Sequence, residues 1–249
     1  MWSREETEVL YSNIFTRRAV RRFSPLENPN EILEWADKLF LIGSKTETAF
    51  KLLDSTQVKG MGAKAPHYLA IYSKPEERAV LNAAFMGQQL ALMMSSRGIG
   101  NCWMGMPSPS LKEADGLPFV IVLAFGKPEE KALRDRVGEF KRKSLAEISD
   151  IKDANELLEA VRLAPSAMNR QPWYLSGDRA NIRLNLKAPG FMMQKALKTM
   201  NLVDMGIALC HLWLAGVHEG VFDRIERESD SVALAGYRYI MTVKMKGKG

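Results

Sequence analysis

The chain repeats one order of segments after roughly 120 residues, and this repeat limits its fold more than any other feature. Residues 82–87 open a long apolar segment, and the similar residues 201–206 open another one 119 positions later. Shorter amphipathic segments that begin at Glu31 and Glu156 come before them, 125 positions apart. Runs typical of β-strands follow both and end in Gly-Lys, with the two glycines 121 positions apart. A period this long exceeds that of solenoid repeats, so we predict an internal duplication.

Each half is predicted to contain a helix, a strand region, a long helix and a further strand. We expect these elements at 31–42, 67–73, 80–97 and 118–125, and again at 155–163, 173–187, 198–219 and 235–246, with a hairpin near Gly177. The long helices are apolar on nearly every face, which is typical of central buried helices. The predicted fold class is α+β, with antiparallel-rich sheets around two long buried helices. We expect a pseudo-dimer within one chain, with intertwined halves at 1–150 and 151–249.

The composition narrows the class of protein and its partners. Hydrophobic residues make up 46% of the chain and charged residues 26%, as in ordinary globular proteins. The net charge is +6, but the basic residues are mostly scattered and not interleaved with aromatic ones, so we expect no nucleic-acid partner. Cys102 and Cys210 lie in apolar segments, which indicates buried thiols in a reducing compartment. The longest apolar stretch, 202–217, is too short to span a bilayer, so we expect a cytoplasmic protein without a membrane partner.

A polar turn at residues 164–173, with the sequence APSAMNRQPW, follows directly on an amphipathic run. Its Pro-Ser step should end a helix, because proline lacks the backbone N–H and restricts the residue before it. The segment then offers backbone N–H groups, the Ser166 hydroxyl and the carboxamides of Asn169 and Gln171. A packed core has little use for so many donors and acceptors, so we predict that this turn forms the wall of a site for a flat, polar heterocycle.

Four arginines occur within six positions near the N-terminus: Arg17, Arg18, Arg21 and Arg22. Guanidinium groups match phosphate oxygens in a bidentate manner, so this run is a candidate phosphate-binding segment. A solvated basic helix end is the alternative, and for an isolated run it is the commoner outcome. The run at residues 141–143 is ambiguous in the same way. The polar turn favours phosphate binding, because it can hold the rest of the same ligand.

Together these motifs resemble the FMN-dependent nitroreductase family. The sequence RRAVRRF at 17–23 resembles that family's RRSxRxF opening, and residues 164–173 are similar to its APSxxNxQPW segment. Further segments resemble the family's strands, central helix, flavin-facing loop and basic C-terminal segment: 65–73, 82–89, 98–105, 117–128 and 140–148. The duplicated order resembles a nitroreductase subfamily in which two half-like units occur in one polypeptide.

The resemblance implies a flavoprotein, an NAD(P)H oxidoreductase of nitroreductase type. Hydride would pass from NADH or NADPH to FMN and then, in a ping-pong cycle, to a nitroaromatic, a quinone or a related small-molecule acceptor. Family members are usually homodimers in which one subunit supplies the arginines and the other supplies the polar turn. Here the first half has the arginines but Phe40, Leu41 and Ser44 in place of the turn, and the second half has the turn without arginines before it. We therefore expect one FMN per chain, and a fused pair that can remain a monomer.

Position by position, the resemblance assigns FMN contacts in both halves: Arg17, Arg18, Arg21, Arg142 and Lys143 near the phosphate, Met104 and Gly105 near flavin N5 and O4, and Pro165, Ser166, Ala167, Asn169 and Gln171 at the ring and ribityl chain. No side-chain acid, base or metal is expected. Ala19 stands where the family has serine, which removes a phosphate hydrogen bond worth about 1 kcal/mol. This departure and the one-sided duplication leave open a non-catalytic descendant that binds flavin or another small ligand.

Overall fold

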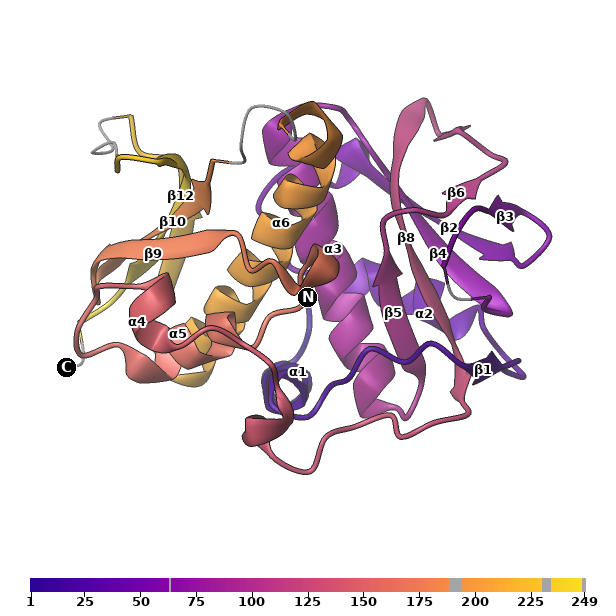
Figure 1. Cartoon of the computed structure of the whole chain (residues 1–249), viewed down its shortest axis with the longest axis horizontal. Coiled ribbons are helices and arrows are strands. Elements are labelled where there is room, and N and C mark those ends of the chain that lie inside the picture. Colours follow the sequence, from indigo (N-terminus) through magenta and orange to yellow (C-terminus); the bar gives the residue numbers. More distant parts are fainter. Residues whose placement is uncertain (63, 189–193, 230–233, 248–249) are drawn as a thin grey trace. The chain divides into compact units, whose positions relative to one another are not determined.

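The computed structural model describes residues 1–62, 64–188, 194–229 and 234–247, which form two compact units, Met1–Glu139 and Phe140–Gly249 (Figure 1). The units divide eleven positions before the boundary that the sequence predicted at residue 150. The reason is local bonding, because residues 140–150 are tied to the second unit. Ser149 forms an isolated parallel bridge with Leu175, and Arg142 and Lys143 hydrogen-bond to the turn after residue 162.

The first unit contains helices and strands in this order: α1 (Arg4–Ile14), β1 (Phe23–Ser24), α2 (Glu31–Glu34), η1 (Trp35–Lys38), η2 (Lys45–Glu47), β2 (Thr48–Asp54), β3 (Val58–Lys59), β4 (His67–Ser73), α3 (Glu77–Ser96), β5 (Gly100–Met104), β6 (Ser108–Pro109), β7 (Glu113–Ala114), β8 (Leu117–Pro128) and η3 (Val137–Glu139). Its main sheet has the order β1-β8-β4-β2, and β5 and β7 also pair with β8. All these pairings are antiparallel. The strand predicted at 67–73 is confirmed, while β2 and β5 are additional strands.

The helix α3 packs against β2, β4, β5 and β8 and is buried from Ala79 to Ser95, which confirms the predicted central helix (Figure 1). Gly87 is the point of closest approach to the sheet. A Cβ atom there would lie 2.7 Å from Cη2 of Trp103 and 2.8 Å from Cδ1 of Ile71. Because side chains alternate along a strand, Trp103 and Ile71 face α3, and their neighbours face the other side of the sheet.

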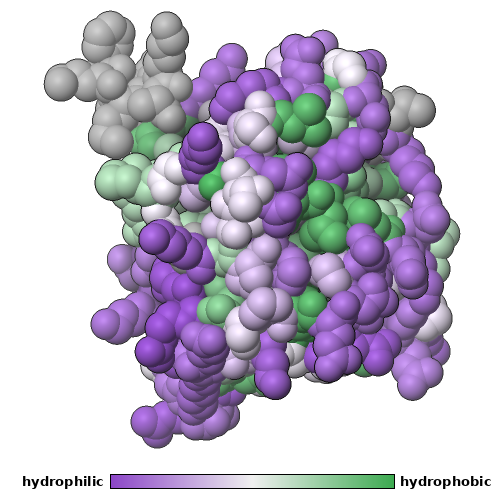
Figure 2. Space-filling view, turned by 90° about the vertical axis from the view of Figure 1, so that its right-hand side faces the viewer, coloured by the Kyte–Doolittle hydropathy of each residue, from purple (hydrophilic) through white to green (hydrophobic). Residues whose placement is uncertain are grey.

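The opposite face of this sheet carries a second apolar cluster: Leu53, Val58, Ala65, Tyr68, Ala70, Tyr72, Cys102, Met104, Ala114, Leu117, Val122 and Ala124. Two tyrosines fix the segments that cover it. The Tyr72 hydroxyl donates to the carbonyl oxygen of Leu111 at 2.9 Å, and the Ala65 N–H donates to the Tyr68 hydroxyl at 3.0 Å. The cover leaves Met61, Met106 and Leu111 exposed. Figure 2 shows a face that is mostly hydrophilic, with apolar areas between the polar side chains.

The second unit contains α4 (Leu145–Ile148), α5 (Asn155–Arg162), η4 (Ala167–Asn169), β9 (Trp173–Asp178), β10 (Asn181–Lys187), α6 (Gln194–His218), β11 (Phe222–Glu226) and β12 (Tyr237–Met245). Its antiparallel sheet has the order β11-β12-β10-β9, and α6 packs against β10, β11, β12 and α5. The hairpin predicted near Gly177 joins β9 to β10. A Cβ at Gly177, whose φ is +104°, would lie 2.3 Å from the carbonyl oxygen of Asn181, so only glycine fits.

The helix α6 is buried from residue 201 to residue 216, as predicted. The expectation that this apolar segment is too short for a bilayer is wrong, because Leu197–His218 is by length and composition long and apolar enough to cross one. However, 89% of its most apolar window is buried inside the structure. Such burial is typical of the core helix of a globular unit.

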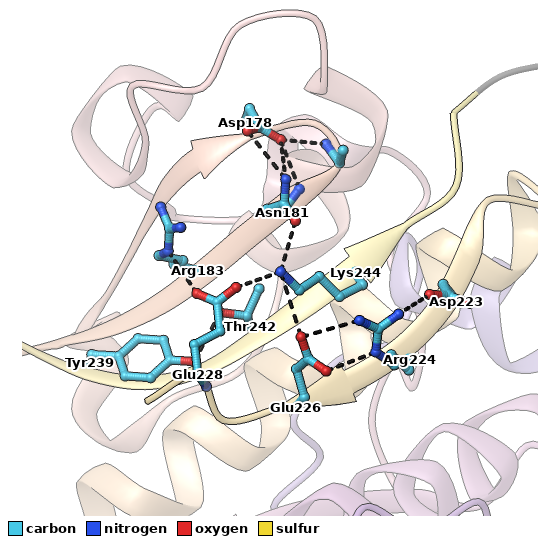
Figure 3. A network of polar contacts seen from close by, with 11 residues as sticks. Asp178, Asn181, Arg183, Asp223, Arg224, Glu226, Glu228, Tyr239, Thr242 and Lys244 are labelled. Carbon is cyan, nitrogen blue, oxygen red and sulfur yellow. Dashed lines mark hydrogen bonds and ion pairs between the residues drawn. The ribbon is translucent and has the colours of Figure 1, made fainter. Parts of the chain in front are cut away.

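The sheet of the second unit carries a charged network (Figure 3). Lys244 on β12 donates to Oδ1 of Asn181 and to Oε1 of Glu228, and it forms an ion pair with Glu226. Nε of Arg183 on β10 donates to Oε2 of Glu228 at 3.0 Å. The network therefore links β10, β11 and β12 through their side chains.

The two units share one order of elements. The first unit has a short helix, then β2, β4, the long helix α3, β5 and β8, and these four strands pair in the order β2-β4-β8-β5. The second unit has α5, then β9, β10, the long helix α6, β11 and β12, and its strands pair in the matching order β9-β10-β12-β11. The sequence repeat thus coincides with a repeat of strand topology within each unit.

Candidate functional site

The arginine segment of the first unit is extended, so the alternative of a basic helix end is wrong. The helix α1 ends at Ile14. Arg17 then forms an antiparallel bridge with Leu133, and Ala19 forms a parallel bridge with Asn101 beside β5. The Val20 N–H donates to the carbonyl oxygen of Asn101 at 3.0 Å. These bonds hold the segment against the strand that carries Cys102 and Met104.

The arginines divide between two sides of this segment. Burial raises the pKa of the Cys102 thiol, and the positive charges of Arg21 and Arg17 partly oppose this rise. Arg22 and Arg18 instead act on Glu130, whose pKa is lowered mainly by the hydrogen bond from the Arg21 backbone N–H and also by these two charges. Arg17 and Arg21 lie two positions before and two positions after Ala19, so they belong to the same side of an extended chain. Arg17 is buried and Arg21 is exposed.

Met104 and Gly105 lie where β5 ends. Met104 is opposite Val122 in the β5–β8 ladder, and its side chain is buried, whereas Gly105 is exposed. The Met104 methyl group packs beneath Gly62, where a Cβ would lie 2.3 Å from Cε of Met104. The backbone of Gly105 is thus open while the Met104 side chain belongs to the apolar cluster.

In the second unit, α5 ends at Arg162, and the polar turn follows as the sequence predicted. The turn contains three non-glycine residues in the left-handed region: Met168 (φ 52°), Asn169 (φ 56°) and Gln171 (φ 49°). Such conformations cost free energy and cluster at functional sites. Pro165, Ser166 and Ala167 are partly exposed, and Met168 and Asn169 are exposed.

The basic segment at residues 141–143 is bonded directly to this turn. Nη1 of Arg142 donates to Oδ1 of Asn169 at 2.7 Å, and Nε of Arg142 donates to the carbonyl oxygen of Ala164 at 3.1 Å. The Lys143 backbone N–H donates to Oε1 of Gln171 at 2.8 Å, and its Nζ donates to the carbonyl oxygen of Gln171 at 2.9 Å. Burial lowers the pKa of the Lys143 amine.

The carboxamides of the turn therefore have internal partners. Gln171 is buried and its Nε2 also donates to the carbonyl oxygen of Asn169 at 3.1 Å. Nδ2 of Asn169 donates to the carbonyl oxygen of Lys141 at 2.8 Å, while the Ser166 hydroxyl accepts from the Gln171 N–H. Many of the donors and acceptors that the sequence assigned to a ligand shape the turn itself.

Sequence analysis missed Asp204, which anchors this turn from α6. Oδ1 of Asp204 accepts a hydrogen bond of 2.9 Å from the Ala167 N–H, and the residue is buried. The signal was present in the sequence, because Asp204 is an acidic residue inside the apolar stretch 202–217. Among the described residues, no three His, Cys, Asp or Glu side chains gather as metal ligands.

Comparisons with known proteins identify a family and a fold. The family model described as "Putative TM nitroreductase" matches residues 9–216, a range that enters both units. A crystal structure from Thermotoga maritima, which carries the same description, has 21% sequence identity to this chain and a TM-score of 0.67. The match covers 96% of this chain and 94% of the Thermotoga maritima chain. That likeness shows a nitroreductase-like fold with mixed helices and antiparallel sheets.

More distant structural matches cover about half of the chain. An FMN-dependent nitroreductase from Clostridium difficile R20291 is 15% identical over 54% of this chain and 98% of its own, with a TM-score of 0.41. An iodotyrosine deiodinase bound to FMN and 3-iodo-L-tyrosine is 16% identical over 55% of this chain and 95% of its own, with a TM-score of 0.39. No curated protein matches the sequence.

Proposed function

The chain belongs to the nitroreductase family that matches residues 9–216, and from this premise we propose that it is an FMN-dependent NAD(P)H oxidoreductase. The observation that carries the proposal is the extended arginine segment held beside β5, in which Arg17 and Arg21 flank Ala19. Two guanidinium groups that act on one region suit a phosphate group, which they can bind in a bidentate manner. The proposal includes a cytoplasmic location, in keeping with two buried thiols.

The donor set of each unit fits part of FMN. In the first unit, Arg17 and Arg21 would bind the phosphate, and the exposed backbone of Gly105 beside Met104 would approach the flavin ring. Arg18, which is half-buried in the same segment, is a further candidate. In the second unit, Pro165, Ser166, Ala167 and Asn169 present backbone and side-chain groups on a strained turn suited to the ring and ribityl chain.

Arg142, Lys143 and Gln171 would act mainly by holding this turn in shape, because their hydrogen bonds join them to one another or to the turn. When bound, FMN supplies the redox chemistry, taking hydride from NADH or NADPH and passing reducing equivalents to a nitroaromatic, quinone or related acceptor. The chain's part is then to bind and orient.

We further propose that the chain is a fused pair of related units that binds one FMN and can be monomeric. The shared strand order of the units supports a duplication. The arginine segment occurs in the first unit and the polar turn in the second. Each unit therefore carries one half of the donor set that the family uses.

Purification and titration test this function. We expect a yellow protein that binds one FMN per chain and loses its oxidised flavin absorption when NADH or NADPH is added without oxygen. The double change Arg17→Gln and Arg21→Gln should weaken FMN binding, whereas Arg22→Gln, which removes a charge on the Glu130 side, is the matched control. A protein that takes up no added FMN would refute the proposal, and binding of two FMN per chain would refute the single site.

A non-catalytic ligand-binding protein is the second candidate. The observation that favours it is the internal bonding of Asn169 and Gln171, which leaves fewer free groups for a cofactor, together with Ala19 in the arginine segment. In that case the purified protein would bind flavin or another flat ligand without oxidation of NADH or NADPH.

A further inference from the structure

Asp204 is an acidic side chain within the buried stretch of α6, and it is 3% exposed. Its Oδ1 accepts the hydrogen bond from the Ala167 N–H, while Oδ2 is buried with no hydrogen-bond partner among the described residues. A buried carboxyl group with an unpaired oxygen costs free energy. Stability alone therefore does not account for this residue.

The first unit fastens its corresponding segment with a neutral group. There Oδ1 of Asn82 on α3 accepts a hydrogen bond of 2.9 Å from the Ile42 N–H, which follows η1 as Ala167 follows α5. In both units the bond joins the backbone after a short helix to a side chain on the long helix. In the repeat Asn82 corresponds to Asn201, one turn before Asp204, and Phe85 stands at the position of Asp204. A neutral asparagine nevertheless makes the same type of bond in the first unit, so the bond itself does not require a charge. What distinguishes Asp204 is its charge.

The surroundings of Asp204 put its charge within reach of neutral pH. Burial raises the pKa of the Asp204 carboxyl group to about 7, although the Ala167 N–H and the positive charge of Arg170 lower it in part. Arg170 belongs to the same turn, and its Nη1 lies 3.5 Å from Oδ1 of Asn201. Among the charged and titratable groups on α6 and on the elements packed against it, Arg162 pairs with Glu159, Arg183 and Lys244 pair with Glu228, and Arg224 pairs with Glu226. His211 bonds to the carbonyl oxygen of Ala160.

We propose that Asp204 is the positioning residue of the turn at residues 165–171 and makes its conformation depend on protonation. The ionised carboxylate holds the Ala167 N–H firmly, because hydrogen bonds to charged acceptors are roughly twice as strong as neutral ones. The protonated carboxyl group accepts a weaker hydrogen bond from the Ala167 N–H. The turn needs this hold, since Met168, Asn169 and Gln171 all have strained backbones.

Ligand binding at the turn then weakens when Asp204 takes up a proton. This step rests on the proposed function, whereas the anchoring of Ala167 does not. One measurement without any ligand and one with flavin therefore separate the two.

The first measurement follows the Ala167 amide by NMR in protein with 15N-labelled alanine, from about pH 5.5 to about pH 8.5. We expect its proton shift to follow one titration near neutral pH in the wild type. In D204N the amide oxygen still accepts the bond but cannot titrate, so the transition should vanish. An Ala167 shift that does not titrate, or that titrates equally in D204N, would overturn the proposal whether or not the protein binds FMN.

The second measurement compares flavin affinity at about pH 8, where Asp204 is ionised. D204A should bind FMN roughly 10-fold more weakly or worse, and D204N should stay within about threefold of the wild type, as expected for a lost and a retained hydrogen bond. Riboflavin, which lacks the titrating phosphate, repeats the comparison at lower pH, and D150N changes an exposed carboxylate as control. A folded D204A with wild-type affinity contradicts the role. If wild-type protein binds neither flavin, the proposed function fails while the amide titration still decides the anchoring.

Discussion

The guanidinium group of Arg142 donates a hydrogen bond of 2.7 Å to Oδ1 of Asn169 and so joins a basic segment to a turn that lies 27 positions later in the chain. The same group donates to the carbonyl oxygens of Leu163 and Ala164, just beyond the C-terminal end of α5. A positive charge there is favourable, because the helix dipole is negative at this end. Arg142 thus stabilises the second unit independently of any ligand.

Replacing Arg142 with alanine should lower the free energy of unfolding by about 1–3 kcal/mol, because several charge-assisted hydrogen bonds disappear together. Thermal or urea unfolding measures the loss. Lys141→Ala is the matched control, since the exposed Lys141 contributes its backbone carbonyl to Asn169 and keeps it after the change. Equal stabilities of R142A and K141A would contradict the structural role of the guanidinium group.

Gly87→Ala should destabilise the first unit even though alanine favours helices. The added methyl group would meet Cη2 of Trp103 at 2.7 Å and Cδ1 of Ile71 at 2.8 Å. Overpacking of this kind costs about 1–3 kcal/mol, which outweighs a gain of about 1 kcal/mol in helix propensity. Urea unfolding followed by tryptophan fluorescence tests this. Gly138→Ala, where nothing lies within 4 Å, should leave stability nearly unchanged.

The long apolar elements could be predicted because their pattern is local. The helices expected at 80–97 and 198–219 occur at Glu77–Ser96 and Gln194–His218. The helix α1 was also predictable, since Ser3 and Glu6 form a capping box that can be recognised in sequence. The edge strand β2 gives a weaker signal, because nearly all its residues are only partly buried and no clear alternation results.

Features fixed by distant contacts could not be predicted in this way. The helix expected at 31–42 ends as a 3-10 turn at Lys38, because Gln89 bonds both the N–H and the carbonyl oxygen of Phe40. The polar turn was located correctly, but its shape depends on Arg142 from one side and Asp204 from the other. Sequence patterns identify residue types for a site and leave open which of them bond to one another.

Acid should weaken the charged network on the second unit's sheet. The hydrogen bond from Lys244 lowers the pKa of Glu228 from 4.5 to about 2, with further help from Arg183 (Figure 3). Because the folded pKa lies below the unfolded one, Glu228 contributes stability above about pH 4.5, and this contribution disappears as the pH falls toward 2.

The change Glu228→Gln should therefore cost about 1–2 kcal/mol at neutral pH, after allowance for solvent screening, and little near pH 2. Urea unfolding at several pH values measures the difference. Asp150→Asn, on an exposed residue, serves as the control. A stability difference between wild type and E228Q that does not change with pH would contradict the network's role.

Protonation of His67 should loosen the start of the first unit's sheet. The Leu26 N–H donates to Nε2 of His67 at 3.1 Å, so this nitrogen must be unprotonated. Burial lowers the pKa of His67, and the carboxylate of Asp54 only partly opposes this. The folded pKa lies below the unfolded value of 6.5, so stability from neutral His67 is complete above pH 6.5 and is lost as the pH falls through the folded pKa.

The change His67→Phe tests this, because phenylalanine keeps a ring beside Phe125 but accepts no hydrogen bond. It should be less stable than the wild type by about 1 kcal/mol at pH 8, and the gap should close in acid. Equal pH dependence of unfolding in both proteins would show that His67 does not sense pH here.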